Sequence, residues 1–112
     1  MTPKFDVIFL EEVMVFLDEL NEKDREKIIY NIDKARYSTD PKLFKKIKGE
    51  IWEFRSRYNK KQYRLFAFWD KRDDKKALVV TSHGIVKKTS KLPIKEIDKA
   101  EMIREKYFEE NY

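Results

Sequence analysis

Apolar residues in the first third of the chain recur with the period of helices. A short β-rich run over 5–10 comes first and predicts a strand. The apolar residues that follow are spaced i, i+3, i+4 and i+7, which predicts one buried helix face: Val13, Phe16, Leu17 and Leu20. Asn21 is a good cap for a second helix, which buries Ile28, Ile32 and Ala35 and ends near Tyr37. About three residues separate the two helices, so we expect an antiparallel helical hairpin.

The second half of the chain is predicted to form strands. Three segments rich in aromatic and β-branched residues, 51–58, 63–69 and 77–83, are separated by the polar loops 59–62 and 70–75. Consecutive strands joined by short loops predict an antiparallel meander, with the apolar segment 63–69 at its centre. Residues 41–49 are expected to be a basic connector that ends in a bend at Gly49. Pro93 suits the first turn of a final helix, and its expected buried face is Ile97, Ala100, Ile103 and Tyr107.

This order of elements predicts an α+β fold, with a strand and helical hairpin packed on an antiparallel meander and followed by a C-terminal helix. We expect one domain over 1–112, because a chain of 112 residues supports one modest core. In the first meander strand, Trp52 and Phe54 point one way while Glu53, Arg55 and Arg57 point the other. The helices are expected to cover the aromatic side and leave the arginines open.

Composition narrows the class of protein. The chain has no cysteine and one histidine, so neither a disulfide framework nor a zinc site is expected, and no cofactor is predicted. Apolar runs are far shorter than the ~20 residues of a membrane span. The first residues lack the apolar stretch of a signal peptide. We therefore expect a cytoplasmic protein without a membrane partner.

Charge is unevenly distributed along the chain. The net charge of +5 combines −4 over residues 1–41, +7 over 42–64, +1 over 65–85, +4 over 86–95 and −3 over 96–112. Cations repeat on strands that are otherwise apolar, and a basic centre between acidic ends favours a polyanionic ligand. RNA is the expected ligand, with an ordinary solvated surface as the alternative.

Three segments in order resemble the RelE/HigB superfamily of toxins, and most closely its phage-derived HigB-like branch. They are Lys48-Gly-Glu-Ile-Trp-Glu-Phe-Arg55, Tyr63-Arg-Leu-Phe66, and His83-Gly-Ile-Val-Lys-Lys-Thr-Ser-Lys-Leu-Pro93. The resemblance covers nearly the whole chain and implies a RelE-like fold. It implies a ribosome-dependent mRNA endoribonuclease, the toxin of a type II toxin–antitoxin system. The implied partners are mRNA on the ribosome and a cognate antitoxin, often a helix-turn-helix DNA-binding protein in this branch.

Cleavage without metal would use the ribose 2′-hydroxyl as nucleophile. This reaction needs cations that stabilise the negative charge developing on the phosphorane oxygens, and groups that assist two proton transfers. The resemblance places Arg55 and Arg64 at the scissile phosphate, and guanidinium groups suit this role. It places Lys87 and Lys88 in a basic loop that closes the same site. The remaining cations are expected to follow the RNA backbone: Lys45, Lys48, Arg57 and Lys91.

The general base is left open. Glu53 is on the same strand face as Arg55, so it is a candidate base or an ion-pair partner that orients Arg55, with the ion pair slightly favoured. His83 is a second candidate, although a lone histidine at a strand end is more often structural. Some relatives stack an aromatic ring on a base after the basic loop. Here that ring would have to come from Tyr58, Tyr107 or Tyr112.

Two other functions fit the same residues. One is a noncatalytic RNA- or ribosome-binding module, for which phosphate contacts alone would give salt-dependent binding. The other is a regulatory protein whose basic face docks an acidic segment of an antitoxin. Two glycines are too few for a phosphate-cradling loop, and the paired acids such as Asp73 and Asp74 are expected to be solvated surface.

Overall fold

The computed structural model describes residues 2–110 and begins with the predicted strand and two helices. Strand β1 spans Asp6–Phe9, helix α1 spans Glu11–Asp18 and helix α2 spans Glu22–Arg36. The Asn21 side chain accepts a hydrogen bond from the Asp24 amide at 2.9 Å, which confirms the predicted cap. The predicted apolar stripes face the core, with Val13, Leu17, Ile28, Ile32 and Ala35 all buried.

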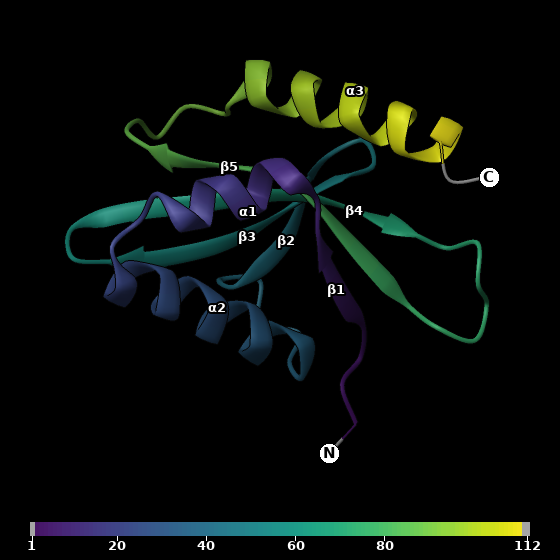
Figure 1. The fold of residues 1–112 in the computed structure, drawn as a ribbon, viewed down its shortest axis with the longest axis horizontal. Helices are drawn as coiled ribbons and strands as arrows, with labels where there is room; N and C mark the ends of the chain where they lie inside the picture. Colours follow the sequence, from purple (N-terminus) through teal and green to yellow (C-terminus); the bar gives the residue numbers. More distant parts are fainter. Residues whose placement is uncertain (1, 111–112) are drawn as a thin grey trace.

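Five strands form one sheet in the order β1-β5-β4-β3-β2 (Figure 1). Strands β2 (Phe44–Lys48), β3 (Ile51–Tyr58), β4 (Lys61–Asp70) and β5 (Leu78–Lys87) are antiparallel neighbours, and β1 joins the edge parallel to β5. The apolar strand β4 is central, as predicted. The architecture confirms the α+β class and is consistent with a RelE-like fold.

The meander is longer than predicted at both ends. Residues 44–48 of the expected connector form the edge strand β2, and β5 continues past His83 to Lys87. Lys87 is therefore a strand residue, whereas the sequence interpretation placed it in a loop. The turn between β3 and β4 is also tighter than predicted, since only Asn59 and Lys60 lie outside the strands, both with positive φ (52° and 65°). Gly49 has φ of 56°, which confirms the predicted bend.

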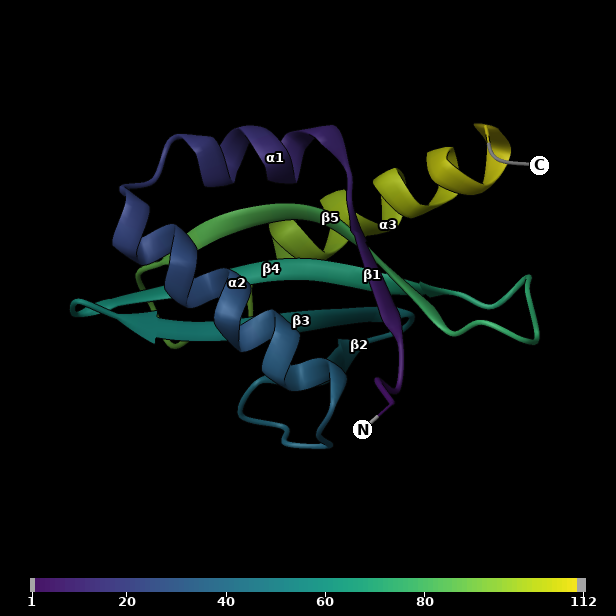
Figure 2. The same ribbon diagram turned by 60° about the horizontal axis from the view of Figure 1, so that its bottom comes forward.

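The helices divide between the two faces of the sheet (Figure 2). Residues of α1 and α2 pack with Phe54, Tyr63, Leu65 and Ala67. Helix α3 (Ile94–Glu110) packs on the other face against Ile51, Phe66, Phe68 and Val80. The expectation that the arginine side would be free of helices is thus wrong in part, because α3 covers one end of that side. We call the side under α1 and α2 the helical face and the other side the α3 face.

Glycine at position 84 permits the close approach of α1 to β5. A Cβ atom at this position would lie 2.6 Å from Cδ2 of Phe16. Strand β5 also contains an irregularity opposite Phe66 and Ala67, so that His83 pairs with Phe66 while Thr81 pairs with Ala67. Ser82 is the extra residue of this bulge, and its hydroxyl donates to the Phe66 carbonyl at 3.2 Å.

Buried polar contacts fix α2 to the meander. The Tyr63 hydroxyl donates a hydrogen bond to the buried Asp24 carboxylate, and the Asn31 side chain donates to the Ser56 hydroxyl at 3.2 Å. Burial and the Asp24 contact raise the pKa of Tyr63 to about 12. Within residues 2–110, no helix combines the length and the apolar character that crossing a membrane requires.

Candidate functional site

The strand register brings the predicted cations together on the uncovered end of the α3 face. Arg55 of β3 pairs directly with Arg64 of β4, and Gln62 of β4 pairs with Lys87 of β5. Glu53 precedes Arg55 by two residues on the same side of β3. Side chains from three neighbouring strands therefore meet at one place, because directly paired residues lie on the same side of a sheet.

One buried carboxylate is shared by the two arginines. Glu53 is 3% exposed, and its two oxygens lie 3.5 Å from Nε of Arg55 and 3.5 Å from Nε of Arg64. Glu53 Oε1 and Arg64 Nε are close enough for an ion pair, but their geometry is outside that of a hydrogen bond. The arrangement agrees with the ion-pair alternative for Glu53 and extends it to a second arginine.

The two arginines differ in exposure. The side chain of Arg64 is 5% exposed and is fixed by hydrogen bonds to the Tyr63 carbonyl at 3.1 Å and the Gln62 side chain at 3.0 Å. Burial lowers the pKa of the Arg64 guanidinium and Glu53 opposes this change, but the group stays cationic as arginine does in proteins. Arg55 is 33% exposed, so it can reach a ligand with less desolvation.

Lys87 lies in a hollow beside this pair. The hollow has a volume of about 320 Å³, and its lining residues are Arg55, Gln62, Arg64, Lys87, Lys88, Thr89 and Ser90. Burial lowers the pKa of the Lys87 ammonium, and Arg64 lowers it further while Glu53 opposes both. A lysine with a depressed pKa among other cations is suited to accept a proton.

A second hollow adjoins the first. It has a volume of about 380 Å³ and its lining residues are Lys42, Arg55, Ser56, Arg57, Gln62 and Arg64. Arg55, Gln62 and Arg64 line both hollows, so the two form one continuous polar surface. We call the residues that line the two hollows, together with Glu53, the basic site.

Most of the predicted RNA contacts are at or beside the basic site. Arg57 and Lys88 line it, and Lys45 pairs with Glu53 from the edge strand β2. Lys48 is outside, because it pairs with Ile51, four residues and about 13 Å along β3 from Arg55. Lys91 is exposed in the loop after β5 and does not line either hollow.

Some residues of the basic site were not predicted from the sequence. Gln62 was assigned to the hairpin loop, yet it lies in β4 and holds Arg64. Its position two residues before Arg64 on a strand was a usable signal, since alternate residues share a face. Thr89 and Ser90 follow the two lysines and add hydroxyl groups to the hollow.

His83 lies apart from the basic site. It is 1% exposed under α3, with its ring stacked on Phe66 at 4.9 Å between centroids and Nε2 at 3.3 Å from Glu96. Burial lowers the pKa of His83, and Lys99 acts in the same direction. Phe66 stands between His83 and Glu53 in the strand register. These contacts favour the structural interpretation of His83.

The candidate stacking aromatics also lie elsewhere. Tyr58 lines a separate hollow with Asn21 and Asp24 on the helical face, and the Tyr107 hydroxyl donates to Asp70 at 2.8 Å. Tyr112 is outside the described residues. Among residues 2–110, no group of three or more histidine, cysteine, aspartate or glutamate side chains is placed to hold a metal ion.

Comparison with known families identifies the family of the chain. The family described as "Phage derived protein Gp49-like (DUF891)" matches residues 15–105, which include all of the basic site and most of the chain. No curated protein matches the chain.

Proposed function

Because the chain belongs to the Gp49-like family of phage-derived proteins, we propose that it is an RNA-cleaving toxin of a toxin–antitoxin pair. The family is one of toxin–antitoxin toxins. The observation that supports RNA as the target is the pair Arg55 and Arg64, held by one buried carboxylate beside a lysine with a lowered pKa. Positive charge on an open, polar sheet face suits a phosphate backbone.

The proposed reaction is attack of the ribose 2′-oxygen on the adjacent phosphorus. The bond from phosphorus to the 5′-oxygen of the next nucleotide breaks, which leaves a 2′,3′-cyclic phosphate and a 5′-hydroxyl. Arg55 and Arg64 would contact the nonbridging oxygens, where negative charge develops in the transition state. Their fixed geometry means that little reorganisation is needed when the phosphorane forms.

Lys87 is the proposed general base. Its neutral amine would accept the 2′-hydroxyl proton, and its lowered pKa makes that neutral form more abundant than for an exposed lysine. Glu53 would act through the arginines as a positioning residue, since both of its oxygens face guanidinium groups. The 5′-oxygen leaves with a proton from solvent or from the site.

The surrounding cations would follow the RNA backbone. Arg57, Lys88 and Lys42 line the hollows, and Lys45 stands at their border. Lys48 and Lys91 lie outside both hollows, so their contribution would come through the long-range field. The natural substrate would be mRNA on the ribosome, and the antitoxin would be of the helix-turn-helix type, as the HigB-like resemblance implies.

Induced expression in a bacterium tests this function. We expect wild-type protein to arrest growth and to create new mRNA 5′ ends inside translated regions, and Arg55→Ala to abolish both. Arg55 is the better first variant, because truncating the buried Arg64 would leave Glu53 with one partner and endanger the fold. Purified variants should melt cooperatively, which shows that lost activity is not lost structure.

Lys71→Ala is the matched control, since Lys71 is exposed in the loop after β4, at the opposite end of this strand from Gln62. It should arrest growth like the wild type. Normal growth and unchanged mRNA ends with folded wild-type protein would refute cleavage and favour a noncatalytic RNA-binding module.

A further inference from the structure

Gln62 lies among the side chains that form the proposed site for phosphate. Three of the described residues line both hollows of the basic site: Arg55, Arg64 and Gln62. The two arginines are the proposed ligands of the reacting phosphate, so this phosphate would lie where the hollows meet. Gln62 borders the same place, and the proposed function gives it no contact with RNA.

The strand register surrounds Gln62 with cations. In the sheet it is directly opposite Arg57 on one side and Lys87 on the other, and Arg64 follows it by two residues on β4. Directly paired residues, and alternate residues of a strand, lie on the same side of a sheet. Gln62 is therefore a half-buried neutral group among three positive charges.

The orientation of the Gln62 amide follows from its contact with Arg64. Nη2 of Arg64 lies 3.0 Å from Oε1 of Gln62. A guanidinium group has hydrogen-bond donors but no acceptor, so the amide atom that faces it must be the oxygen. The amide nitrogen then occupies the other branch of the side chain, and its two hydrogens bond none of residues 2–110.

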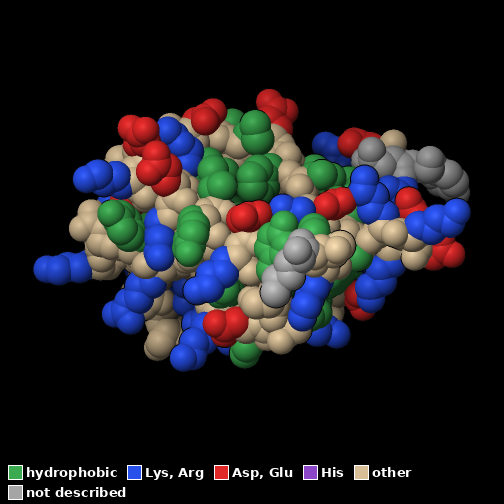
Figure 3. Space-filling model, turned by 90° about the horizontal axis from the view of Figure 1, so that it is seen from below, with side chains coloured by type: hydrophobic (Ala, Val, Ile, Leu, Met, Phe, Trp, Pro, Cys, Tyr) green, Lys and Arg blue, Asp and Glu red, His purple; other side chains and the backbone are tan. Residues whose placement is uncertain are grey.

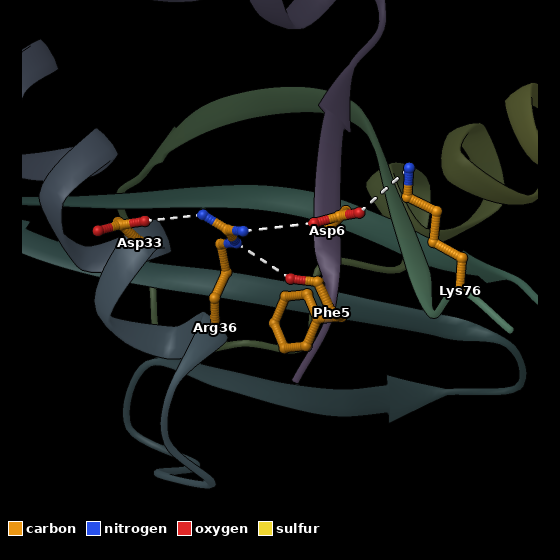
Figure 4. A network of polar contacts seen from close by, with 5 residues as sticks. All are labelled: Phe5, Asp6, Asp33, Arg36 and Lys76. Carbon is orange, nitrogen blue, oxygen red and sulfur yellow. Dashed lines mark hydrogen bonds and ion pairs between the residues drawn. The ribbon is translucent and has the colours of Figure 1, made fainter. Parts of the chain in front are cut away.

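A structural arginine of this protein provides a comparison. Basic and acidic side chains are interspersed on the side of the molecule that Figure 3 shows, and Figure 4 shows how Arg36 is held between carboxylates. Its three nitrogens all have acceptors within the protein: the Phe5 carbonyl at 3.0 Å, Asp33 at 2.9 Å and Asp6 at 3.3 Å. In the basic site, the Arg55 side chain makes one ion pair, with Glu53 at 3.5 Å, and no hydrogen bond within residues 2–110. Arg55 and Gln62 thus keep donors for an acceptor from outside the protein.

The neutral charge of Gln62 suits this position. Arg64 is 5% exposed, and its hydrogen bond polarises the amide, which makes the amide N–H groups stronger donors. Gln62 thereby brings the influence of a buried cation toward the hollows. A further cation here would add to the repulsion between the arginines and Lys87, and a carboxylate would repel phosphate. A neutral donor avoids both effects.

We propose that Gln62 is a further catalytic residue, which donates a hydrogen bond from its amide nitrogen to a nonbridging oxygen of the reacting phosphate. This role deepens the proposed RNA-cleaving function and rests on it. Negative charge develops on this oxygen in the transition state, where oriented hydrogen-bond donors have their largest effect. Because Arg64 already orients the amide, the donor needs little rearrangement when RNA binds.

Contact with phosphate is tested first, without cleavage. Gln62 is the sole glutamine of the chain, so protein labelled with ¹⁵N in its glutamine side chain gives one pair of amide proton signals. The probe is a single-stranded RNA oligonucleotide with 2′-O-methyl groups, which carries phosphates but has no free 2′-hydroxyl to attack them. We expect it to shift the Gln62 amide signals downfield. A mixture of the same 2′-O-methyl nucleosides, which lack phosphate, should leave them unchanged.

Two substitutions separate donation to RNA from support of Arg64. Gln62→Met keeps the length of the side chain and removes both of its hydrogen-bonding groups. Gln62→Glu keeps an oxygen for Arg64 but has no hydrogen to donate. We expect each variant to unfold as cooperatively as the wild type and to cleave RNA about 10²-fold more slowly, a loss typical of one donor to a developing oxyanion. Wild-type cleavage by Gln62→Glu would overturn the proposal and show that Gln62 only supports Arg64.

Sulfur in place of a nonbridging oxygen at the cleaved phosphate identifies the contacted atom, because sulfur is a weaker hydrogen-bond acceptor. In one of the two configurations, sulfur should slow the wild type and should slow Gln62→Met less, since this variant has already lost the contact. Lys42→Met is the matched control, because Lys42 lines one of the two hollows and should leave the sulfur effect as in the wild type. Equal sulfur effects in the wild type and in Gln62→Met would contradict donation to this phosphate.

The proposed function and the role of Gln62 fail in different measurements. If the wild type does not cleave RNA, the proposed function is refuted, and the amide signals still decide whether Gln62 contacts phosphate. Amide signals that do not move with the oligonucleotide, or that move equally with the nucleosides, would refute the contact even if the wild type cleaves RNA.

Discussion

Two arginines share one buried carboxylate, and this sharing determines the charge that the basic site presents. Without Glu53, the paired Arg55 and Arg64 would repel each other across β3 and β4. With it, the cluster of three side chains keeps a net charge of +1 and a fixed geometry. The roles of Glu53 as ion-pair partner and as general base predict different results when its charge is removed.

Glu53→Gln should lower the free energy of unfolding by about 3 kcal/mol, because it leaves the buried Arg64 without its counter-charge. Urea unfolding measures this loss. Some RNA cleavage should remain, and its rise with pH should persist but move to lower pH, because the Glu53 charge raises the pKa of Lys87. Glu50→Gln is the matched control, since Glu50 is exposed in the β2–β3 turn and should change stability little. Complete loss of cleavage with wild-type stability would instead identify Glu53 as the base.

Lys87 gives the proposed reaction its dependence on pH. Its pKa is lowered by burial and by Arg64, so its neutral form appears at a lower pH than for an exposed lysine. If the neutral amine accepts the proton, cleavage should increase as pH rises through this lowered pKa and level off above it. Single-turnover cleavage rates on an RNA oligonucleotide, measured across the alkaline pH range, would show this rise of the rate with pH.

Because arginine stays protonated, Lys87→Arg should abolish the rise of the cleavage rate with pH. It should also reduce the cleavage rate by about 10²- to 10⁴-fold, the range of general base catalysis. If the cleavage rate of this variant still rises with pH as in the wild type, another group must be the general base.

The elements were predicted well where their pattern is regular. Both N-terminal helices follow the regular spacing of an apolar helix face, and residues 63–69 of β4 form an almost continuous apolar run. These helices and this part of β4 were located correctly. Strand β2 was missed because its apolar residues Phe44 and Ile47 are three apart, which breaks the alternation of a strand. The structure explains this spacing by a register irregularity between Lys46 and Lys48.

The extension of β5 to Lys87 and the side of the sheet that α3 covers could also not be predicted from the sequence pattern. Strand β5 continues through a bulge at Ser82, so its period changes in the middle of the strand. Helix α3 has the predicted buried face, with Ile97 and Ala100 in the core, but a helical stripe does not say which side of a sheet it covers. Arg55 and Arg64 are charges on otherwise apolar strands, and the family resemblance placed them and the predicted loop residue Lys87 in the site, whereas the neutral Gln62 gave no such contrast.

Contact between α1 and β5 depends on the absence of a side chain at Gly84. Gly84→Ala would place a methyl group 2.6 Å from the Phe16 ring, so we expect it to lower the free energy of unfolding by about 1–3 kcal/mol. Chemical denaturation provides the measurement. Phe16→Leu removes part of the ring, so the double variant should be more stable than the sum of the two single losses predicts. Strict additivity would show that the clash is relieved in another way.

At the scale of the whole molecule, charge is distributed unevenly. The basic site occupies the open end of the α3 face, whereas residues 1–41, which contain β1, α1 and α2, have a net charge of −4. Such a charge distribution orients an approaching RNA before contact, and this effect weakens as salt is added.

Binding of single-stranded RNA should therefore weaken with salt. The slope of the logarithm of the binding constant against the logarithm of the salt concentration should be about −0.7 for each phosphate contacted. Removing a cation of the basic site with Lys88→Ala should reduce the slope by about that amount. Lys48→Ala removes the same charge outside the hollows, where it acts only through the long-range field, and should change the slope less. Fluorescence anisotropy at several salt concentrations measures both. Equal effects of the two variants would mean that RNA binding is spread over the sheet edge.

Strand β1 is parallel to β5, and this pairing has a consequence for the order in which the protein folds. Asp6 pairs with Leu78, roughly seventy positions later, so closing this contact has a high entropic cost and occurs late. During synthesis the first strand must wait for β5 to leave the ribosome, and β5 also supplies Lys87. A nascent chain would therefore acquire its sheet edge and its proposed general base together, only after β5 has been synthesised.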